Sequence, residues 1–419
     1  MEQQNYKTTS NQHINIIDRP CGTGKTTELL KSFDIDKKYL VVVPLLTEVE
    51  RVMQDACVSF VQPTSEYLFN KTDSLRDLLI SGENIVTTHS MYSRITLMAR
   101  DGLLDDYHLI IDEVPEVVKS GTDIKSKSYK DIYIEGGFIA EDGDTGKVTP
   151  TQKWTDCLED TNDTLSKRLY EEASSGCLYN VNDVFLLWAL PIEVLTKNKS
   201  LTIYTYLAKG SMLLAYLDKL NVKYHHDINT KLDLEFRRKA KSLITVETIP
   251  AIEKMNLSTT GQSKMGKDNK DKVATALKNL RGRGGLNGVP IDNIIITSLK
   301  SNWFYKGINN GKTIKPSGFS KGSGVFKANW LSNTTRGTNN YVHTTHMVYL
   351  WDQHINDYLR RWLNMGNGRF EANNNYAITE LVQWVYRSQV RKGLPITLYL
   401  PSSRMRGLLE SWLNAEDFK

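Results

Sequence analysis

The sequence predicts an α/β fold in which parallel strands form the sheets of two domains. The chain has 419 residues, and at about 100–200 residues per domain this length corresponds to two domains, or three. Short apolar runs alternate with stretches of helical periodicity, as expected for βαβ units. The runs are continuous in Val, Ile and Leu, which is typical of parallel strands that are covered on both faces.

The first half of the chain shows this pattern in order. We expect buried strands and helices in alternation, with strands at residues 14–17, 39–43, 84–88 and 109–111 and helices at 26–32 and 47–56. Residues 119–182 are polar and rich in turn-forming residues, which predicts an irregular insertion with one helix at 163–173. The pattern resumes with strands at 201–206 and 222–226 around a helix at 211–220.

Apolar content falls and charge rises between residues 227 and 241, which predicts a linker between two domains. Residues 1–226 then form the first domain, and residues 242–419 form the second. The second domain repeats the α/β pattern, with strands at 243–248, 293–298, 347–350 and 396–400. Lysine-rich residues 262–272 contain few apolar side chains, so we expect a mobile loop there, and we expect a long loop at 306–324.

Composition excludes several classes of protein. The four cysteines, at positions 21, 57, 157 and 177, lack C-x-x-C spacing, which argues against a zinc ribbon or disulfide framework and fits a reducing cytosol. No signal peptide is expected, and no apolar run approaches the roughly 20 residues of a membrane span, so we expect a cytoplasmic protein with no membrane partner.

The net charge is +5, and the basic residues between 231 and 283 fit either a phosphate-contacting surface or a solvated linker.

The strongest chemical signal is a glycine-rich loop between a predicted strand and a predicted helix. Its sequence is Pro20-Cys21-Gly22-Thr23-Gly24-Lys25-Thr26-Thr27. Glycines let the backbone curl so that successive N–H groups face a phosphate, and the lysine then reaches the β- and γ-phosphates of ATP. The Thr26 hydroxyl is expected to ligate Mg²⁺. The loop is a shortened form, because Arg19 stands where the full pattern has a glycine.

The second signal is a pair of carboxylates, Asp112 and Glu113, at the end of the predicted strand 109–111. The carboxyl ends of strands in open α/β sheets face the ligand crevice. There, Asp112 is expected to hold Mg²⁺, and Glu113 is expected to orient and activate the attacking water. Together with the phosphate-binding loop, this pair indicates an ATPase.

The third signal lies far along the chain. Gln383, Arg387 and Arg391 are spaced by four residues, so a continuous helix would place all three on one face. Such a face is either a solvated basic stripe or an arginine finger that a second domain presents to the γ-phosphate. The second interpretation gives all three residues a catalytic role.

These three signals together resemble a superfamily 2 helicase of the DEAD/DEAH-like type, in particular the compact versions of bacteriophages. Residues 19–26 look like motif I, residues 112–115 like the DExx box, and residues 383–391 like motif VI. The resemblance implies two tandem RecA-like P-loop NTPase domains with ATP and Mg²⁺ in the cleft between them. One departure is Thr205-Tyr206-Leu207, where the family usually has Ser/Thr-Ala-Thr in the motif that links hydrolysis to strand movement.

The resemblance also implies binding roles for individual residues. The nucleotide contacts are residues 20–27 together with Gly337. The implied nucleic-acid contacts are Pro44, Leu45, Thr88, His89, Lys300 and Arg336. Either Arg387 or Arg391 is the expected arginine finger. Among the aromatic residues, Trp303 and Tyr305 lie near a predicted loop and are the better candidates for stacking on bases.

The resulting prediction is an ATP-dependent DNA helicase or translocase that moves on single-stranded or forked DNA in replication, recombination or repair, with replication proteins as further partners. The first alternative is an RNA helicase of the same superfamily, because these motifs grip the backbone and do not read bases. The second is a nucleotide-gated binding or loading ATPase without unwinding, which the unusual Thr205-Tyr206-Leu207 favours. The sequence leaves the direction of travel and the oligomeric state open.

Overall fold

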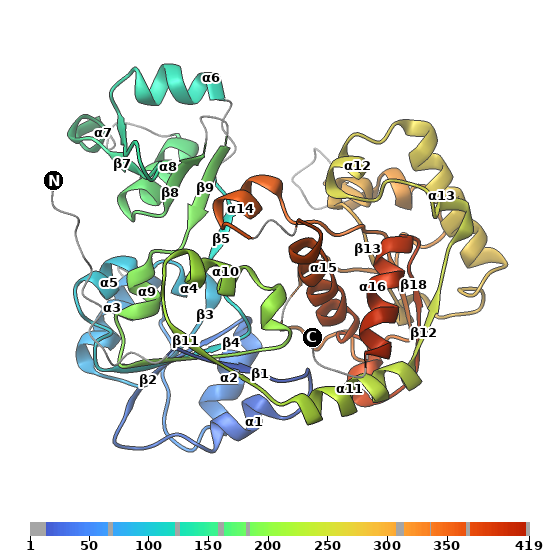
Figure 1. The fold of residues 1–419 in the computed structure, drawn as a ribbon, viewed down its shortest axis with the longest axis horizontal. Helices are drawn as coiled ribbons and strands as arrows, with labels where there is room; N and C mark the ends of the chain where they lie inside the picture. The colour runs from blue at the N-terminus through green and yellow to red at the C-terminus, as the bar shows by residue number, and fades with distance from the viewer. Residues whose placement is uncertain are drawn as a thin grey trace.

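The chain folds into two α/β domains, each built on a parallel sheet (Figure 1). The computed structural model describes residues 14–65, 70–121, 126–157, 163–181, 185–306, 314–335, 337–365 and 369–415. The first sheet has six strands in the order β11-β1-β10-β4-β2-β3, and the second has five in the order β12-β18-β17-β13-β16. The predicted α/β fold with two parallel sheets is therefore confirmed.

The first sheet brings the carboxyl ends of its strands to one edge. Its strands are β1 (Ile14–Asp18), β2 (Lys38–Val43), β3 (Ile85–Thr88), β4 (Tyr107–Asp112), β10 (Ser200–Thr205) and β11 (Tyr224–Ile228). Its helices are α1 (Lys25–Leu30), α2 (Leu46–Asp55), α3 (Lys71–Ser81), α4 (His89–Tyr92), α5 (Thr96–Arg100), α9 (Ile192–Thr196) and α10 (Met212–Lys219). Strand β10 lies between β1 and β4. Its last residue, Thr205, therefore lies beside Asp18 of β1 and close to the end of β4.

The insertion between β4 and β10 has more regular structure than predicted. It contains β5 (Val118–Ser120), α6 (Ser126–Ser128), a π-helix (Tyr129–Ile134), β6 (Ile139–Glu141), β7 (Val148–Pro150), α7 (Gln152–Cys157), α8 (Thr164–Ser174), β8 (Leu178–Val181) and β9 (Phe185–Ala189). Aromatic residues such as Tyr129, Tyr133 and Trp154 form a separate core for it, and it stands out at the upper left of Figure 1. Helix α8 matches the predicted helix, and the Asp163 side chain caps its amino end.

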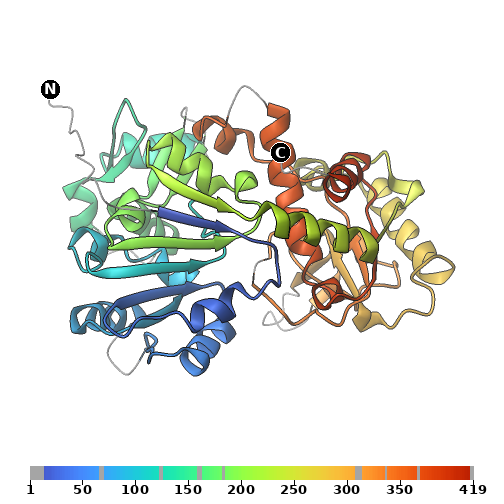
Figure 2. The same ribbon diagram turned by 60° about the horizontal axis from the view of Figure 1, so that its bottom comes forward.

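The expected linker at 227–241 is largely helical. Strand β11 extends to Ile228 in the first sheet, and α11 (Thr230–Leu243) runs from the first domain to the second (Figure 2). The Asn229 side chain caps this helix by accepting a hydrogen bond from the Leu232 amide. A domain boundary within 227–241 stays a prediction, and the structure adds that a helix makes the connection.

The second sheet is formed by β12 (Ile244–Glu247), β13 (Ile294–Thr297), β16 (Asn329–Trp330), β17 (His346–Tyr349) and β18 (Ile396–Tyr399). Its helices are α12 (Thr259–Ser263), α13 (Lys267–Gly282), α14 (Asp357–Trp362), α15 (Arg369–Val385) and α16 (Ser403–Asn414). A hairpin of β14 (Phe304–Lys306) and β15 (Ile314–Pro316) lies in the region expected to be a long loop. None of the helices in the described residues combines the length and apolar character that crossing a membrane requires.

The prediction of a mobile loop at 262–272 is wrong, because most of this stretch belongs to α12 and α13. Helix α13 buries Val273, Ala274, Ala276 and Leu277 on one face, and this face begins only after the lysine-rich turns. Those first turns are exposed, so their composition resembles that of a loop although their backbone is helical.

Helix α14 joins the two domains through apolar contacts. It belongs to the second half of the sequence, but its Leu359 and the flanking Ile355 and Leu363 are buried in the hydrophobic core of the first domain. Trp362 stacks on Tyr216 of α10 at a ring distance of 6.0 Å. Figure 1 shows α14 lying against the first domain and the base of the insertion. The interface between the domains is therefore partly a shared core.

Candidate nucleotide site between the two domains

The glycine-rich loop of residues 20–27, the predicted phosphate-binding loop, follows β1 and leads into α1. Gly22 and Gly24 have φ angles of +77° and +87°, a left-handed conformation that glycine adopts without strain. Helix α1 begins at Lys25, directly after Gly24. This is the strand, glycine turn and helix that the sequence predicts for a phosphate site.

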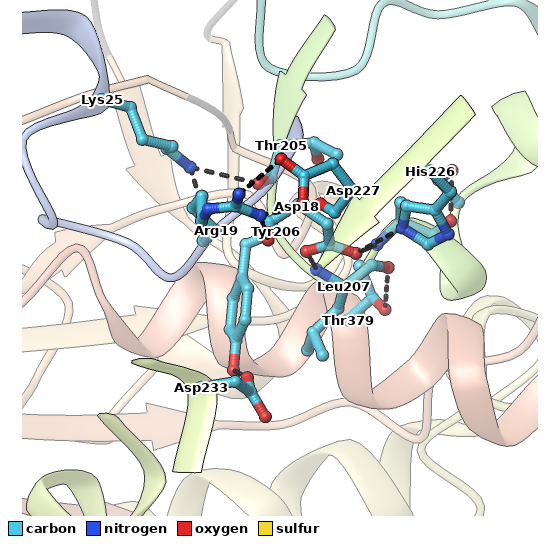
Figure 3. Close-up of polar contacts among 12 residues, drawn as sticks. Asp18, Arg19, Lys25, Thr205, Tyr206, Leu207, His226, Asp227, Asp233 and Thr379 are labelled. Carbon is cyan, nitrogen blue, oxygen red and sulfur yellow. Dashed lines mark hydrogen bonds and ion pairs between the residues drawn. The ribbon is translucent and has the colours of Figure 1, made fainter. Parts of the chain in front are cut away.

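Lys25 is folded back onto the loop. Its Nζ donates hydrogen bonds to the carbonyl oxygens of Arg19 at 2.9 Å and of Thr205 at 3.2 Å (Figure 3). Backbone carbonyls thus hold the ammonium group beside the loop, where phosphate oxygens would replace them as acceptors. The same contact connects the loop to the end of β10.

Arg19 occupies the position where the full loop pattern has a glycine, and its side chain points away from the loop. Its Nη2 pairs with Asp227 Oδ2 at 2.5 Å, and its Nη1 donates to the Asp227 carbonyl at 2.8 Å. Figure 3 shows this guanidinium held beside Asp227. Arg19 therefore fastens β11 to the loop and does not line the cavity described below.

Thr26 and Asp112 supply two oxygen atoms suited to a magnesium ion. The Thr26 hydroxyl donates to Asp112 Oδ2 at 3.1 Å, so both oxygens are already close together. Hydroxyl and carboxylate oxygens are the hard donors that Mg²⁺ prefers. Desolvation, reinforced by the negative charge of Glu113, raises the pKa of Asp112 to about 6. A divalent cation would relieve this cost, so the residues present fit the ion.

Glu113 adopts a strained backbone conformation. Its φ is +65°, which is uncommon for a residue with a side chain, and its amide donates to the Tyr204 carbonyl at 2.8 Å. Its Oε1 lies 3.5 Å from Nη2 of Arg387 in the second domain. Arg387 is only 2% exposed, and its Nε has no hydrogen-bond partner among the described residues. An anion between the two domains would satisfy this guanidinium.

One cavity of about 410 Å³ collects these groups from both domains. The first domain contributes Cys21, Gly22, Gly24, Lys25, Thr26, Thr27, Pro44, Glu48, Arg51, Asp112 and Glu113. The second contributes Gly337, Asn339, Val342, Tyr386, Arg387, Arg391 and Lys392. Most predicted nucleotide-site residues therefore meet here. Pro20 and Thr23 are not among the lining residues; the Thr23 hydroxyl donates to the Pro20 carbonyl within the loop.

The three residues of the third signal do not share a helix face, which corrects the prediction. Helix α15 ends at Val385, Arg387 lies in the following turn, and Arg391 lies in a short 3-10 helix, Gln389–Lys392. The backbone has left the helical path by Gln389, whose amide donates a hydrogen bond to the distant Thr344 carbonyl. Arg387 and Arg391 both reach the cavity nevertheless, and Arg391 Cγ lies 3.7 Å from where a Cβ of Gly22 would stand.

Gln383 contacts the other domain, and it does not line the cavity. Its Nε2 donates to the carbonyl oxygen of Tyr206 at 3.0 Å, and the side chain is 2% exposed. Its predicted catalytic role stays a prediction, and the observed contact is one between the domains.

The residues with implied nucleic-acid roles are dispersed. Pro44 lines the nucleotide cavity, where a Cβ on Gly337 would lie 2.6 Å from its ring. Leu45 precedes α2, and His89 Nε2 lies 2.9 Å from the Asp112 carbonyl oxygen. The Thr88 hydroxyl pairs with Ser90, and Lys300 Nζ lies 5.5 Å from the Phe304 ring. Arg336 lies outside the described residues. Their roles toward nucleic acid stay predictions.

Sequence reasoning missed Asp18, a buried carboxylate at the end of β1. Its two oxygens accept hydrogen bonds from the amides of Leu207 and Ala208, each at 2.8 Å. His226 Nε2 lies 3.0 Å from the same carboxylate (Figure 3). These contacts hold Leu207 in a left-handed conformation with φ of +57°. The signal was an aspartate that ends a strand containing three isoleucines.

The unusual Thr205-Tyr206-Leu207 segment lies where several elements meet. The Tyr206 hydroxyl donates to Asp233 on α11 at 2.6 Å, and the Thr379 hydroxyl on α15 donates to the Leu207 carbonyl at 3.2 Å. Thr205 accepts from Lys25, as described above. The segment therefore contacts the phosphate-binding loop, the connecting helix and the second domain at once (Figure 3).

Sequence reasoning also missed Glu48 and Arg51, which line the cavity from α2. Arg51 Nη2 donates to the Thr27 hydroxyl at 3.1 Å, and its Nη1 lies 3.4 Å from Glu48. A charged pair three residues apart is common on exposed helices, so its pattern alone carried no functional signal.

Comparisons with known proteins match the chain as follows. A family model described as the YonV C-terminal Rossmann-like domain matches residues 238–413. The SPbeta prophage-derived uncharacterized protein YonV of Bacillus subtilis (strain 168) is 27% identical over 430 residues, covering 96% of this chain and 99% of the relative.

Two solved structures are similar in fold over most of the chain. One is S. tokodaii Xpd4, with a TM-score of 0.42 and 12% identity over 98% of this chain and 95% of that chain. The other is a variant of S. cerevisiae Dbp5 bound to RNA and ADP BeF3, with a TM-score of 0.41 and 10% identity over 97% of this chain and 84% of that chain.

Proposed function

We propose that this protein is an ATP hydrolase that couples hydrolysis, with Mg²⁺, to movement on nucleic acid as a helicase or translocase. One observation carries the proposal: a single cavity receives Lys25, Asp112 and Glu113 from one domain and Arg387 and Arg391 from the other. A site divided in this way is completed only when the domains are close together, so nucleotide binding and domain arrangement depend on each other.

The role of each side chain follows from its chemistry and place. Lys25 exchanges its two carbonyl acceptors for phosphate oxygens. Thr26 and Asp112 hold Mg²⁺, which neutralises charge on the phosphates when bound. Glu113 orients the attacking water, and the Arg387 guanidinium stabilises negative charge on the transferred phosphoryl group.

The Thr205-Tyr206-Leu207 segment connects the nucleotide site with the contacts between the two domains. A phosphate that draws Lys25 away from the Thr205 carbonyl removes one restraint on this segment. Tyr206 and Leu207, in turn, are held by Gln383 and Thr379 of the second domain. We propose that these contacts change when a nucleotide binds and is hydrolysed. We also propose that the nucleic acid along which the protein moves is DNA.

The test is the rate of ATP hydrolysis with and without single-stranded DNA, matched single-stranded RNA and forked duplexes. We expect stimulation by single strands, and the preferred polymer separates a DNA helicase from an RNA helicase. Lys25→Ala is expected to lower the rate by about 100-fold. Unchanged hydrolysis in that variant would contradict the phosphate-site assignment. The prophage origin given in the name of the YonV relative supports a phage-encoded protein. We propose that it acts in the host cytoplasm, in DNA replication, recombination or repair.

A second candidate is a nucleotide-gated binding or loading ATPase that does not unwind. The observation that favours it is the segment around α14, in which Leu359 of the helix and the flanking Ile355 and Leu363 are buried in the core of the first domain. Large apolar interfaces restrict relative domain motion. Strand-displacement assays decide between the two: nucleic-acid-stimulated hydrolysis without displacement or translocation favours the gated binder.

A further inference from the structure

The second domain carries a strongly basic stretch of sequence. Residues 254–351 contain fifteen lysines and arginines and only three aspartates, although the whole chain has a net charge of only +5. Within this stretch, residues 293–351 contain no acidic residue. The stretch forms α12, α13 and the β14–β15 hairpin, and α12 and α13 lie at the upper right of Figure 1. A surface with a large excess of positive charge attracts a polyanion.

The β14–β15 hairpin presents an aromatic residue and a cation on the same side. Tyr305 pairs directly with Lys315 across the two strands, so their side chains share one face. The neighbouring Phe304 points to the other face and packs edge-on against Trp330 at 5.4 Å. Tyr305 is 51% exposed, whereas Trp303, the other stacking candidate from the sequence, is only 1% exposed.

Further lysines lie beside this hairpin. Lys300 is in a short 3-10 helix that contacts β14, and Lys321 follows another, Gly318–Ser320, that contacts the first. Lys300, Lys315 and Lys321 are exposed, and the structure records no ion pair between them and any described residue. Their charges are therefore available to a ligand. Exposed aromatic rings among available cations are the combination that binds single strands, by stacking on bases and contacting phosphates.

We propose that Tyr305 stacks on a base of single-stranded nucleic acid while Lys315 contacts the adjacent phosphate. The proposal rests on the proposed function for the class of its ligand. It adds a contact surface on the hairpin, where the stacking ring is Tyr305 and the charge comes from exposed lysines that form no ion pair with the described residues.

The experiment measures binding of fluorescent oligothymidylate and oligouridylate to the full chain by anisotropy. Tyr305→Ala is expected to raise the Kd about 5- to 20-fold, and Tyr305→Phe, which keeps the ring, to change it less than about twofold. Lys315→Ala is expected to reduce the slope of log K against log salt by about 0.7. Lys223→Ala, an exposed lysine of the first domain, is the matched control and is expected to leave both values unchanged.

A second measurement does not depend on a substitution. An oligonucleotide with 5-iodouracil crosslinks to stacked aromatic rings on irradiation, and mass spectrometry of the wild-type adduct is expected to locate the crosslink at Tyr305. If Tyr305→Ala binds like wild type and no crosslink forms at Tyr305, while single strands still stimulate hydrolysis, this inference fails and the proposed function stands. If wild type binds neither oligonucleotide and hydrolysis does not respond to them, both fail.

Discussion

Arg387 of the second domain lies 3.5 Å from Glu113 of the first, Nη2 to Oε1, inside the cavity that both domains line. The pair places the expected arginine finger beside the carboxylate expected to activate water. Their charges offset each other without a nucleotide. A γ-phosphate between them would replace Glu113 as the ion-pair partner of Arg387. The Glu113 carboxylate would then accept a hydrogen bond from the attacking water.

This geometry distinguishes the two arginines. Arg387 is buried beside Glu113, whereas Arg391 packs over Gly22 of the phosphate-binding loop. We expect Arg387→Ala to lower kcat by about 1,000-fold and Arg391→Ala to act mainly on KM for ATP. Steady-state kinetics with saturating single-stranded DNA measures both. A larger loss of kcat in the Arg391 variant would reverse the assignment.

Replacing Glu113 by glutamine is expected to separate binding from hydrolysis. The amide keeps the shape of the side chain but accepts no proton, so turnover should fall by about 100- to 1,000-fold while ATP binding is retained. Calorimetric titration with ATP and Mg²⁺ measures the binding. Glu116→Gln, an exposed residue paired with Lys119, is the control and should turn over ATP normally. Normal turnover in Glu113→Gln would remove this carboxylate from the mechanism.

Asp112→Asn is expected to abolish hydrolysis and to stabilise the protein without Mg²⁺ and nucleotide. Because desolvation raises the pKa of Asp112 from 3.8 to about 6, the folded state holds its proton to higher pH than the unfolded state does. The free energy of unfolding therefore falls as pH rises through this range. The variant avoids this loss, so its advantage should be small below about pH 4 and reach about 3 kcal/mol above about pH 6.

Thermal unfolding in EDTA at several pH values measures that difference. Asp106→Asn, an exposed aspartate in the turn before β4, is the matched control and should show no such pH-dependent gain. An advantage of Asp112→Asn that is equal at all pH values would point to a cause other than the buried charge.

Gly210 is expected to be intolerant of alanine because it lies against α15 of the other domain. A Cβ there would collide with the Asn375 carbonyl oxygen and the Thr379 hydroxyl. We expect Gly210→Ala to lower the free energy of unfolding by about 1–3 kcal/mol and to weaken stimulation of hydrolysis by single strands. Gly407→Ala, at an exposed position of helix α16 with open space around it, should instead stabilise by about 0.5–1 kcal/mol. Chemical denaturation of both variants tests the contrast.

Local sequence is sufficient to predict the positions of those parts of the candidate site that lie on continuous segments. The loop around Lys25 and the pair Asp112 and Glu113 each follow a buried strand, so a short pattern fixes both chemistry and position. The sequence places Arg387 at the site but predicts a helix that is too long. After Val385 the chain contacts Thr344, more than forty residues away, and no local pattern encodes this contact. The contacts of Asp18 and Tyr206 likewise join residues far apart in sequence, and no local pattern encodes them.

The placement of α14 has a consequence for the order in which the protein is made. Chains fold from the amino end as the ribosome releases them. When the last strand of the first sheet emerges, Ile355, Leu359 and Leu363 have not been synthesised, although they fill part of that domain's core. The first domain therefore leaves the ribosome with an open apolar face that closes only after most of the second has appeared, and a fragment that ends at the connecting helix would keep that face exposed to water and to aggregation.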